Sequence, residues 1–205
     1  MRPILVTGFT PFASHDANPS AMLVERFAAD GVSGVAVEAM LVDVLWESAA
    51  ARVIERYDRL RPSAVICFGL AGERDRITIE RFAVNVDDTA TADNVGIVRA
   101  GVAIRTDGPD AYRSTLPLAA MARAVAAEGV PVAFSNHAGA FLCNHVFYAI
   151  RDRIAQAGEA VPAGFVHLPP YAAVPAEDQW RAARRLVAAV GAEVGIADER
   201  ERLAG

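Results

Sequence analysis

Residues 64–69 read Ala-Val-Ile-Cys-Phe-Gly, an unbroken apolar run that stops at a glycine. A shorter run of the same kind, Ile-Leu-Val at residues 4–6, is followed by Gly8. Strands that helices cover on both faces have continuous apolar sequences, whereas half-exposed strands alternate between apolar and polar residues. Both runs therefore predict central strands of a parallel sheet.

Helical segments separate these strands. The first begins at Asn18-Pro19, an N-cap residue followed by a proline at the first helical position. Further helices are predicted at residues 47–60, 116–128, 143–157 and 176–194, and further strands at residues 35–41, 77–86, 131–135 and 164–168. This alternation indicates an α/β fold, a three-layer α/β/α sandwich with a mostly parallel twisted sheet. We expect a single domain, residues 1–205, with its active residues at the carboxyl ends of strands.

The strand predicted at residues 77–86 changes phase part of the way along. Its apolar residues fall on odd numbers at Ile77 and Ile79 and on even numbers from Phe82 onward. A period of two that changes parity indicates a β-bulge, which can turn a side chain toward a site of chemistry. We therefore expect a bulge at Glu80-Arg81.

Composition excludes several classes of protein. All 20 basic residues are Arg, so a lysine Schiff base, a Ser–Lys dyad and a P-loop NTPase are ruled out. The formal net charge of −5 gives no basic surface for nucleic acid or anionic lipid. The apolar stretch at residues 4–6 is too short for a signal or membrane segment, and the two cysteines are Cys67 and Cys143. We expect a soluble, cytoplasmic protein with reduced cysteines.

The two cysteines occupy different positions in the predicted fold. Cys143 follows a strand and a loop of small residues and lies where a helix begins. Unpaired N–H groups and the helix dipole lower a thiol pKa at such a position, which favours a nucleophilic thiolate. A buried cysteine packed as a small apolar residue is the alternative reading. Cys67 lies inside an apolar strand, where we expect it to be structural.

A thiol nucleophile needs a base, and the sequence contains 4 histidines. His145 follows Cys143 by two positions and therefore points to a different side of the helix. His15 and His137 lie in predicted loops, where a solvated histidine is common. His167 ends an apolar strand, and a parallel sheet would place it at the same edge as the Cys143 loop. Glu80, at the phase change, is the best carboxylate to orient the imidazole of His167.

Metal and cofactor chemistry find less support. His137, Cys143 and His145 match no common zinc spacing, and their predicted directions diverge. Residues 69–72, Gly-Leu-Ala-Gly, lack the third glycine of a dinucleotide-binding loop and read better as a turn. We expect neither a metal nor a cofactor.

The chain resembles the type I pyroglutamyl peptidases, also called pyrrolidone-carboxylate peptidases, a family of cytosolic cysteine exopeptidases. The resemblance spans nearly the whole chain and rests on motifs that occur in the family's order. These motifs are residues 4–12, 18–20, 77–81, 84–88, 93–94, 114–117, 135–141, 143–148 and 164–169.

The resemblance implies a catalytic set of Cys143, His167 and Glu80. It also implies removal of an N-terminal pyroglutamyl residue from peptides without a metal or cofactor, by an enzyme often found as a tetramer. The pyroglutamyl ring would lie in an apolar pocket to which five residues correspond: Phe9, Phe12, Leu70, Phe141 and Leu142. A pyroglutamyl group has no free ammonium, so apolar walls and a few amide hydrogen bonds suit it.

The chain departs from the family pattern at three places. Family members usually carry Arg and Ile before a Pro-Asp-Asn motif, where this sequence has Ala90, Thr91 and Ala92. If that Arg stabilises the tetrahedral oxyanion, its absence leaves this task to backbone N–H groups. Leu70 stands where many members have Gln, and Pro170 is also unusual. Two alternatives stay open: a cysteine amidase for other blocked or lactam-like substrates, and a binder of pyroglutamate-like ligands without turnover.

Overall fold

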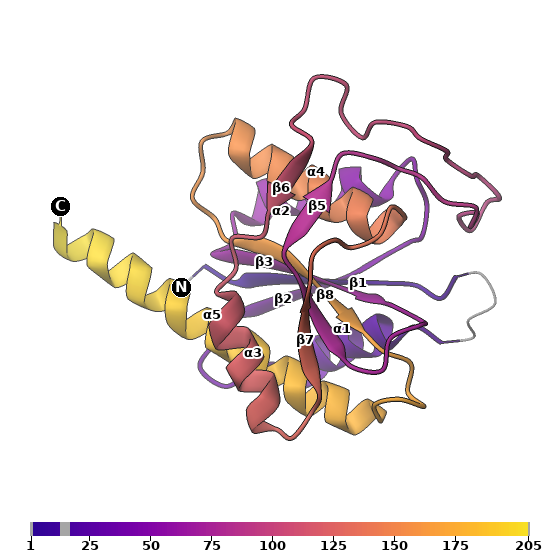
Figure 1. Ribbon diagram of the computed structural model, residues 1–205. Helices are drawn as coiled ribbons and strands as arrows, with labels where there is room; N and C mark the ends of the chain where they lie inside the picture. Colours follow the sequence, from indigo (N-terminus) through magenta and orange to yellow (C-terminus); the bar gives the residue numbers. More distant parts are fainter. Residues whose placement is uncertain (1, 13–16, 205) are drawn as a thin grey trace.

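The computed structural model describes residues 2–12 and 17–204, and beyond residue 195 it describes only the backbone of the last helix. This part of the chain forms eight strands and five helices, which alternate except where β3 to β6 follow one another (Figure 1). The strands are β1 (Ile4–Phe9), β2 (Val37–Val42), β3 (Ala64–Leu70), β4 (Ile77–Glu80), β5 (Phe82–Val84), β6 (Ala111–Arg113), β7 (Val132–Ser135) and β8 (Ala163–Leu168). The helices are α1 (Pro19–Asp30), α2 (Ala49–Leu60), α3 (Leu118–Ala127), α4 (Leu142–Gln156) and α5 (Ala176–Ala204).

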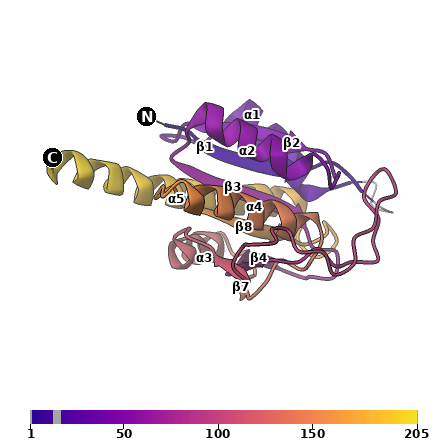
Figure 2. The same ribbon diagram turned by 90° about the horizontal axis from the view of Figure 1, so that it is seen from above.

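Six strands form the main sheet in the order β2-β1-β3-β8-β4-β7 (Figure 2). The first four strands in this order, β2, β1, β3 and β8, run parallel to one another, as the continuous apolar runs predict. β4 pairs antiparallel with β8 and parallel with β7, so β4 and β7 run in the opposite direction. The prediction of a mostly parallel sheet is confirmed.

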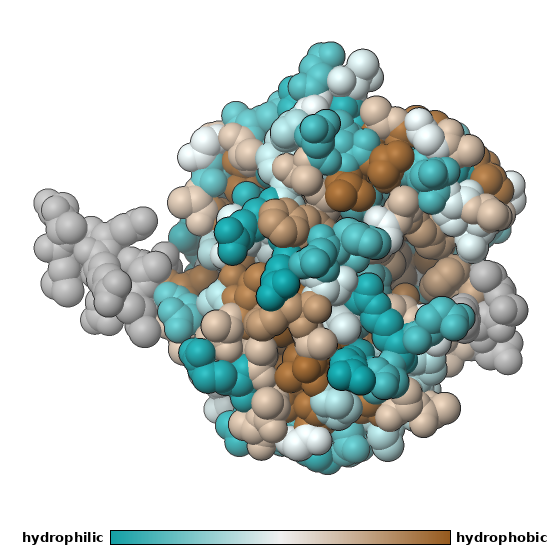
Figure 3. Space-filling model, viewed as in Figure 1, coloured by the Kyte–Doolittle hydropathy of each residue, from teal (hydrophilic) through white to brown (hydrophobic). Residues whose placement is uncertain are grey.

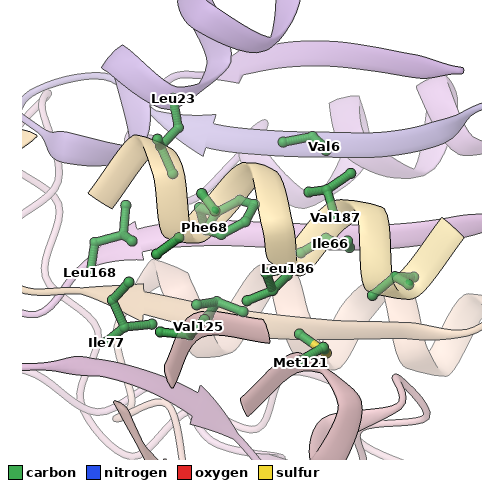
Figure 4. Packing of buried hydrophobic residues seen from close by; sticks show 14 of the residues in the cluster. Val6, Leu23, Ile66, Phe68, Ile77, Met121, Val125, Leu168, Leu186 and Val187 are labelled. Atoms are coloured by element: carbon green, nitrogen blue, oxygen red, sulfur yellow. The ribbon is translucent and has the colours of Figure 1, made fainter. Parts of the chain in front are cut away.

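Helices cover both faces of the main sheet. Figure 1 shows α2 and α4 on one side of the strands and α1, α3 and α5 on the other. Each helical layer packs a hydrophobic core against the sheet. The first core contains Leu23 of α1, Met121 of α3 and Leu186 of α5 (Figure 4). The second contains Val53 of α2 and Phe147 of α4. The prediction of a three-layer α/β/α sandwich is therefore confirmed.

Helix α1 begins as its sequence predicts. The Asn18 side chain accepts a hydrogen bond from the backbone N–H of Ser20 at 3.1 Å, and Pro19 occupies the first turn. The Ser20 hydroxyl in turn accepts a hydrogen bond from the backbone N–H of Phe9 at 2.9 Å. The helix cap thereby fixes the end of β1.

The predicted bulge at Glu80-Arg81 is wrong. Glu80 ends β4 in the main sheet, and the chain then leaves that sheet to form β5, which pairs with β6 in a separate two-stranded sheet. The backbone N–H of Arg81 donates to Ser135 and its carbonyl accepts from Ser114, each at 2.8 Å. The parity changes because the residues on its two sides belong to different sheets.

Residues 85–110 connect β5 and β6 without a regular helix or strand, and Figure 1 shows them as a long excursion from the body. Buried polar side chains hold this segment. Asn144 of α4 bonds to the backbone of Val84 and Val86. Asp87 is fully buried and bonds to His145 and Arg99. The segment is therefore attached to the first turns of α4.

The surface mixes hydrophilic and hydrophobic residues on the face that Figure 3 shows. Among the described residues, no helix has the length and apolar character needed to cross a membrane.

Candidate active site

His167 and Glu80 meet on the face of the sheet that α4 covers. Thr78 of β4 is the antiparallel partner of His167 of β8, so Glu80 lies diagonally across from His167 on the same face. The imidazole Nδ1 lies 2.7 Å from Glu80 Oε1. Glu80 is fully buried and His167 is 4% exposed. The two groups form a direct hydrogen bond in a site that excludes most water.

Burial acts on both members of this pair. For His167, burial lowers the pKa below the usual 6.5, against the raising effect of Glu80. For Glu80, burial opposes ionisation, but the interactions with His167, Ser135 and Arg74 together outweigh it and hold the pKa below 4.5. At neutral pH the pair is therefore a neutral imidazole beside a carboxylate.

Cys143 is the second residue of α4 and lies over the end of β3. A Cβ atom placed on Gly69 would be only 2.8 Å from Cys143 Sγ and 2.8 Å from the ring of Phe165. Gly69 is the parallel partner of His167. The thiol therefore lies above the strand pair that carries the imidazole.

Cys143 and His167 come together by a different route from the one that the sequence predicts. The prediction assumed that the strand before Cys143 runs parallel to the strand that carries His167, whereas β7 follows the direction of β4, opposite to that of β8. Residues 136–141 make the connection by joining β7 to α4, and Ala138 of this loop packs in the α2 and α4 core.

The predicted low pKa of the Cys143 thiol is also wrong. Burial raises this pKa to about 12, and the negative charge of Glu80 adds to the effect. Desolvation therefore exceeds the effect of the helix N-terminus, and the thiol is protonated at neutral pH. Cys67 is fully buried within β3, and burial raises its thiol pKa to about 11, as a structural cysteine requires.

A small apolar pocket lies beside Cys143. All five residues predicted for the pocket line it, together with Asn18 and Val44: these are Phe9, Phe12, Leu70, Phe141 and Leu142. The rings of Phe12 and Phe141 are 5.5 Å apart between centroids. The Asn18 amide is engaged by the Thr10 carbonyl and by Ser20. The side chains of the lining are therefore almost entirely apolar.

The other histidines have separate surroundings. His145 Nδ1 lies 2.9 Å from Asp87 Oδ2, and its ring packs edge-on against Trp46. His137 Nδ1 accepts from the backbone N–H of Gly139 at 3.2 Å. His15 lies outside the described residues. Within the part of the chain that the structure describes, no group of three or more His, Cys, Asp or Glu could hold a metal ion.

Sequence reasoning missed Arg74, Asn18 and Val44 as members of this site. Arg74 donates to Glu80 Oε1 at 2.5 Å from the connection between β3 and β4. Its signal was a basic residue shortly after a strand end and six positions before Glu80. Asn18 was recognised only as a helix cap, and Val44 carries no sequence signal of its own.

An α/β/α sandwich in which a thiol lies over the strands that carry a paired imidazole and carboxylate, beside a small apolar pocket, has the architecture of a cysteine hydrolase. Comparison with known sequences identifies the particular group. Residues 2–196 match the family model described as pyroglutamyl peptidase, and the chain belongs to this family.

Individual relatives agree with this assignment. The chain is 44% identical to pyrrolidone-carboxylate peptidase 1 of Ralstonia nicotianae, over 82% of this chain and 79% of that protein. It superposes on the crystal structure of Bacillus amyloliquefaciens pyroglutamyl peptidase I with a TM-score of 0.88 and 30% identity, covering 94% and 98% of the two chains. Pyrrolidone carboxyl peptidase from Thermococcus litoralis gives a TM-score of 0.89 and 28% identity, with coverage of 97% and 96%.

Proposed function

We propose that this protein hydrolyses the amide bond that follows an N-terminal pyroglutamyl residue, with Cys143 as nucleophile, His167 as base and acid, and Glu80 as the group that orients His167. One observation carries the proposal. The Cys143 thiol forms part of the wall of a small apolar cavity and at the same time lies over the strand pair that bears His167.

The cavity supports the substrate class. Its lining is almost entirely apolar and it is far smaller than the roughly 300–1,000 Å³ typical of pockets for drug-sized ligands, so it can admit at most one small ring, and only after lining side chains move apart. A charged N-terminal ammonium would be buried there without a carboxylate partner, which is costly. The pyroglutamyl ring carries no charge, and backbone groups can satisfy its amide. The cavity therefore favours a blocked, cyclic N-terminal residue.

The first chemical step begins from neutral partners, because burial raises the pKa of Cys143 and lowers that of His167. As Sγ attacks the carbonyl carbon, the thiol proton passes to Nε2 of His167. Glu80 holds the Nδ1–H through the 2.7 Å contact and stabilises the imidazolium that forms. Collapse of the tetrahedral intermediate breaks the C–N bond, and the imidazolium protonates the departing amine.

The second step releases the acyl group. His167 takes a proton from water, and the hydroxide attacks the thioester carbonyl and displaces the thiolate, which recovers its proton from the imidazolium. The products are pyroglutamate and the shortened peptide. N–H groups in the first turn of α4 have no partner within the helix and are the donors closest in sequence to Cys143 for the oxyanion. Ala90 is exposed and supplies no charge for that purpose.

The nucleophile assignment is tested with Cys143→Ala on a pyroglutamyl-coumarin amide. We expect kcat to fall by about 10⁴-fold or more, since removal of a nucleophile disables the whole set. Cys67→Ala is the matched control, because it removes a second buried thiol from the same core, and its kcat should stay within about threefold of wild type. Turnover by Cys143→Ala at the wild-type rate sinks the proposal.

A panel of N-terminally blocked amides tests the substrate class. We expect the pyroglutamyl amide to have the highest kcat/KM, because a larger or charged acyl group does not suit the cavity. Faster hydrolysis of another blocked amide would assign the protein to a related class of cysteine amidase. Labelling of Cys143 by iodoacetamide with no hydrolysis of any amide would indicate a binding protein.

Location and assembly complete the proposal. We place the protein in the cytoplasm as a homo-oligomer, and as a tetramer in particular. The two unpaired cysteines support a reducing compartment, and the family resemblance supports the tetramer. Light scattering on a sizing column tests the assembly: a mass of one chain at micromolar concentration contradicts it.

A further inference from the structure

Arg74 occupies a position between the strands that build the site. Its Nη1 donates to Glu80 Oε1 at 2.5 Å and also to the Thr78 hydroxyl, both on β4. Its Nη2 donates to the hydroxyl of Ser135, the last residue of β7, at 3.3 Å. The side chain is 28% exposed, whereas the carboxylate that it contacts is fully buried. One guanidinium thus links two strands at the point where Glu80 lies.

Glu80 depends on few partners. Its Oε1 accepts both from Arg74 and from Nδ1 of His167, whereas its Oε2 has no hydrogen-bond partner among the described residues. A buried carboxylate is stable only when it is paired and hydrogen-bonded. Without Arg74, Glu80 would keep only neutral partners, the imidazole of His167 and the hydroxyl of Ser135. The neutral imidazole carries no charge, so Arg74 is the cation that compensates Glu80.

We propose that Arg74 is a positioning residue, which holds the Glu80 carboxylate ionised and in place so that it fixes the tautomer of His167. In that tautomer Nδ1 carries the hydrogen toward Glu80 and Nε2 is free to accept the proton of Cys143. Arg74 does not line the pocket beside Cys143. This role rests on the proposed function for its kinetic effect.

The charge of Arg74 also acts on the titration of the site. Burial and Glu80 dominate the pKa of both His167 and Cys143, and the guanidinium lowers each of them. The other titratable group that acts on Cys143 is Cys67, of β3. Removal of the guanidinium therefore raises both pKa values. The ascending limb of kcat/KM against pH moves to higher pH, whichever of the two groups it reports.

The test compares Arg74→Gln, which is neutral, with Arg74→Lys, which keeps the charge. Arg76→Gln is the matched control, because Arg76 lies two positions away and pairs with the exposed Asp75. For Arg74→Gln we expect kcat to fall about 10- to 100-fold, as for loss of a hydrogen bond to a charged group, with KM within about threefold of wild type. The ascending limb should move to higher pH. Arg74→Lys should keep the wild-type limb, and Arg76→Gln should change neither quantity.

Two outcomes overturn the proposal. The first is an Arg74→Gln enzyme with the kcat and pH limb of wild type. The second is an Arg74→Lys limb that moves as far as that of Arg74→Gln, since Arg74 would then act through shape alone. If circular dichroism shows that Arg74→Gln does not fold, Arg74→Lys provides the test by itself. An ascending pH limb at the wild-type position then supports the role of Arg74, and a displaced limb rejects it.

A second measurement separates this proposal from the proposed function. The rate of Cys143 alkylation by iodoacetamide, followed by peptide mass spectrometry, reports thiolate formation without any substrate. We expect its rise with pH to be displaced to higher pH in Arg74→Gln and unchanged in Arg76→Gln. Absence of hydrolysis by wild type would reject the proposed function, whereas an undisplaced alkylation profile in Arg74→Gln would reject the role of Arg74.

Discussion

The two faces of the main sheet carry different kinds of side chain. On the face toward α1, α3 and α5, the strands present apolar side chains such as Ile66 and Val166. On the face toward α2 and α4, the same strands present Cys67 and His167, and β4 adds Glu80. Both faces are packed with apolar side chains, but only the face toward α2 and α4 also holds the paired His167 and Glu80.

This difference shows how the fold can combine stability with chemistry. Close packing on the first face holds the strands in register, and the register sets the distance between His167 and Glu80. The second face carries polar groups whose burial costs free energy unless each is paired. A substitution on the first face should therefore act mainly on stability, whereas a substitution beside His167 and Glu80 on the second face should act on catalysis.

Glu80→Gln should show the largest effect. An amide at this position can leave His167 in the wrong tautomer, so we expect kcat to fall by about 10⁴-fold. KM should change little, because Glu80 is not part of the cavity lining. Steady-state kinetics on the coumarin amide measure both, with the exposed Glu73→Gln as control. A Glu80→Gln kcat within threefold of wild type would show that the imidazole needs no carboxylate.

Two glycines on opposite faces sharpen the comparison. An alanine Cβ at Gly69 would lie 2.8 Å from Cys143 Sγ, whereas one at Gly164 would lie 2.3 Å from Ser114 Oγ and 2.8 Å from Leu116. Gly69→Ala should displace the thiol and lower kcat about 10²-fold. Gly164→Ala should lower the free energy of unfolding by about 1–3 kcal/mol. Kinetics and urea unfolding of both variants give the test, and similar losses of kcat per folded molecule in the two would contradict the division.

The dependence of activity on pH should show the smallest effect. Since burial lowers the pKa of His167 below 6.5, the imidazole is neutral at pH 7 and becomes protonated only in more acid solution. We expect kcat/KM to be level near neutrality and to fall about tenfold per pH unit below that pKa. A limb with its midpoint above pH 7 would indicate that formation of the thiolate controls the rate instead.

The sequence predicted those parts of the fold that local patterns determine. The runs at β1, β3 and β8 are apolar because both faces are covered, and the cap at Asn18 follows from its side-chain oxygen. Other features depend on long-range pairing. Nothing local sets the reversed direction of β4 and β7, and β6 has only three residues. Such short strands form only where a partner such as β5 already lies.

The candidate site divides in the same way. Cys143 and His167 lie at the ends of secondary-structure elements, which sequence patterns can locate. Glu80 was selected because it is the carboxylate at the point where the apolar pattern changes parity. The thiol pKa was predicted with the wrong sign, because the helix dipole is a local effect whereas burial depends on the whole fold. Arg74 was missed for a similar reason: the 2.5 Å contact with Glu80 depends on how the connection between β3 and β4 folds back.

The protonated, buried state of Cys143 also affects how fast its sulfur is oxidised during oxidative stress. Peroxides and other small oxidants attack thiolates far faster than thiols, and Cys143 is only 9% exposed behind aromatic rings. The sulfur is therefore protected during the intervals between encounters with substrate. For the same reason, a reagent whose small, uncharged ring enters the pocket and places its reactive carbon beside the sulfur should inactivate the protein faster than iodoacetamide does.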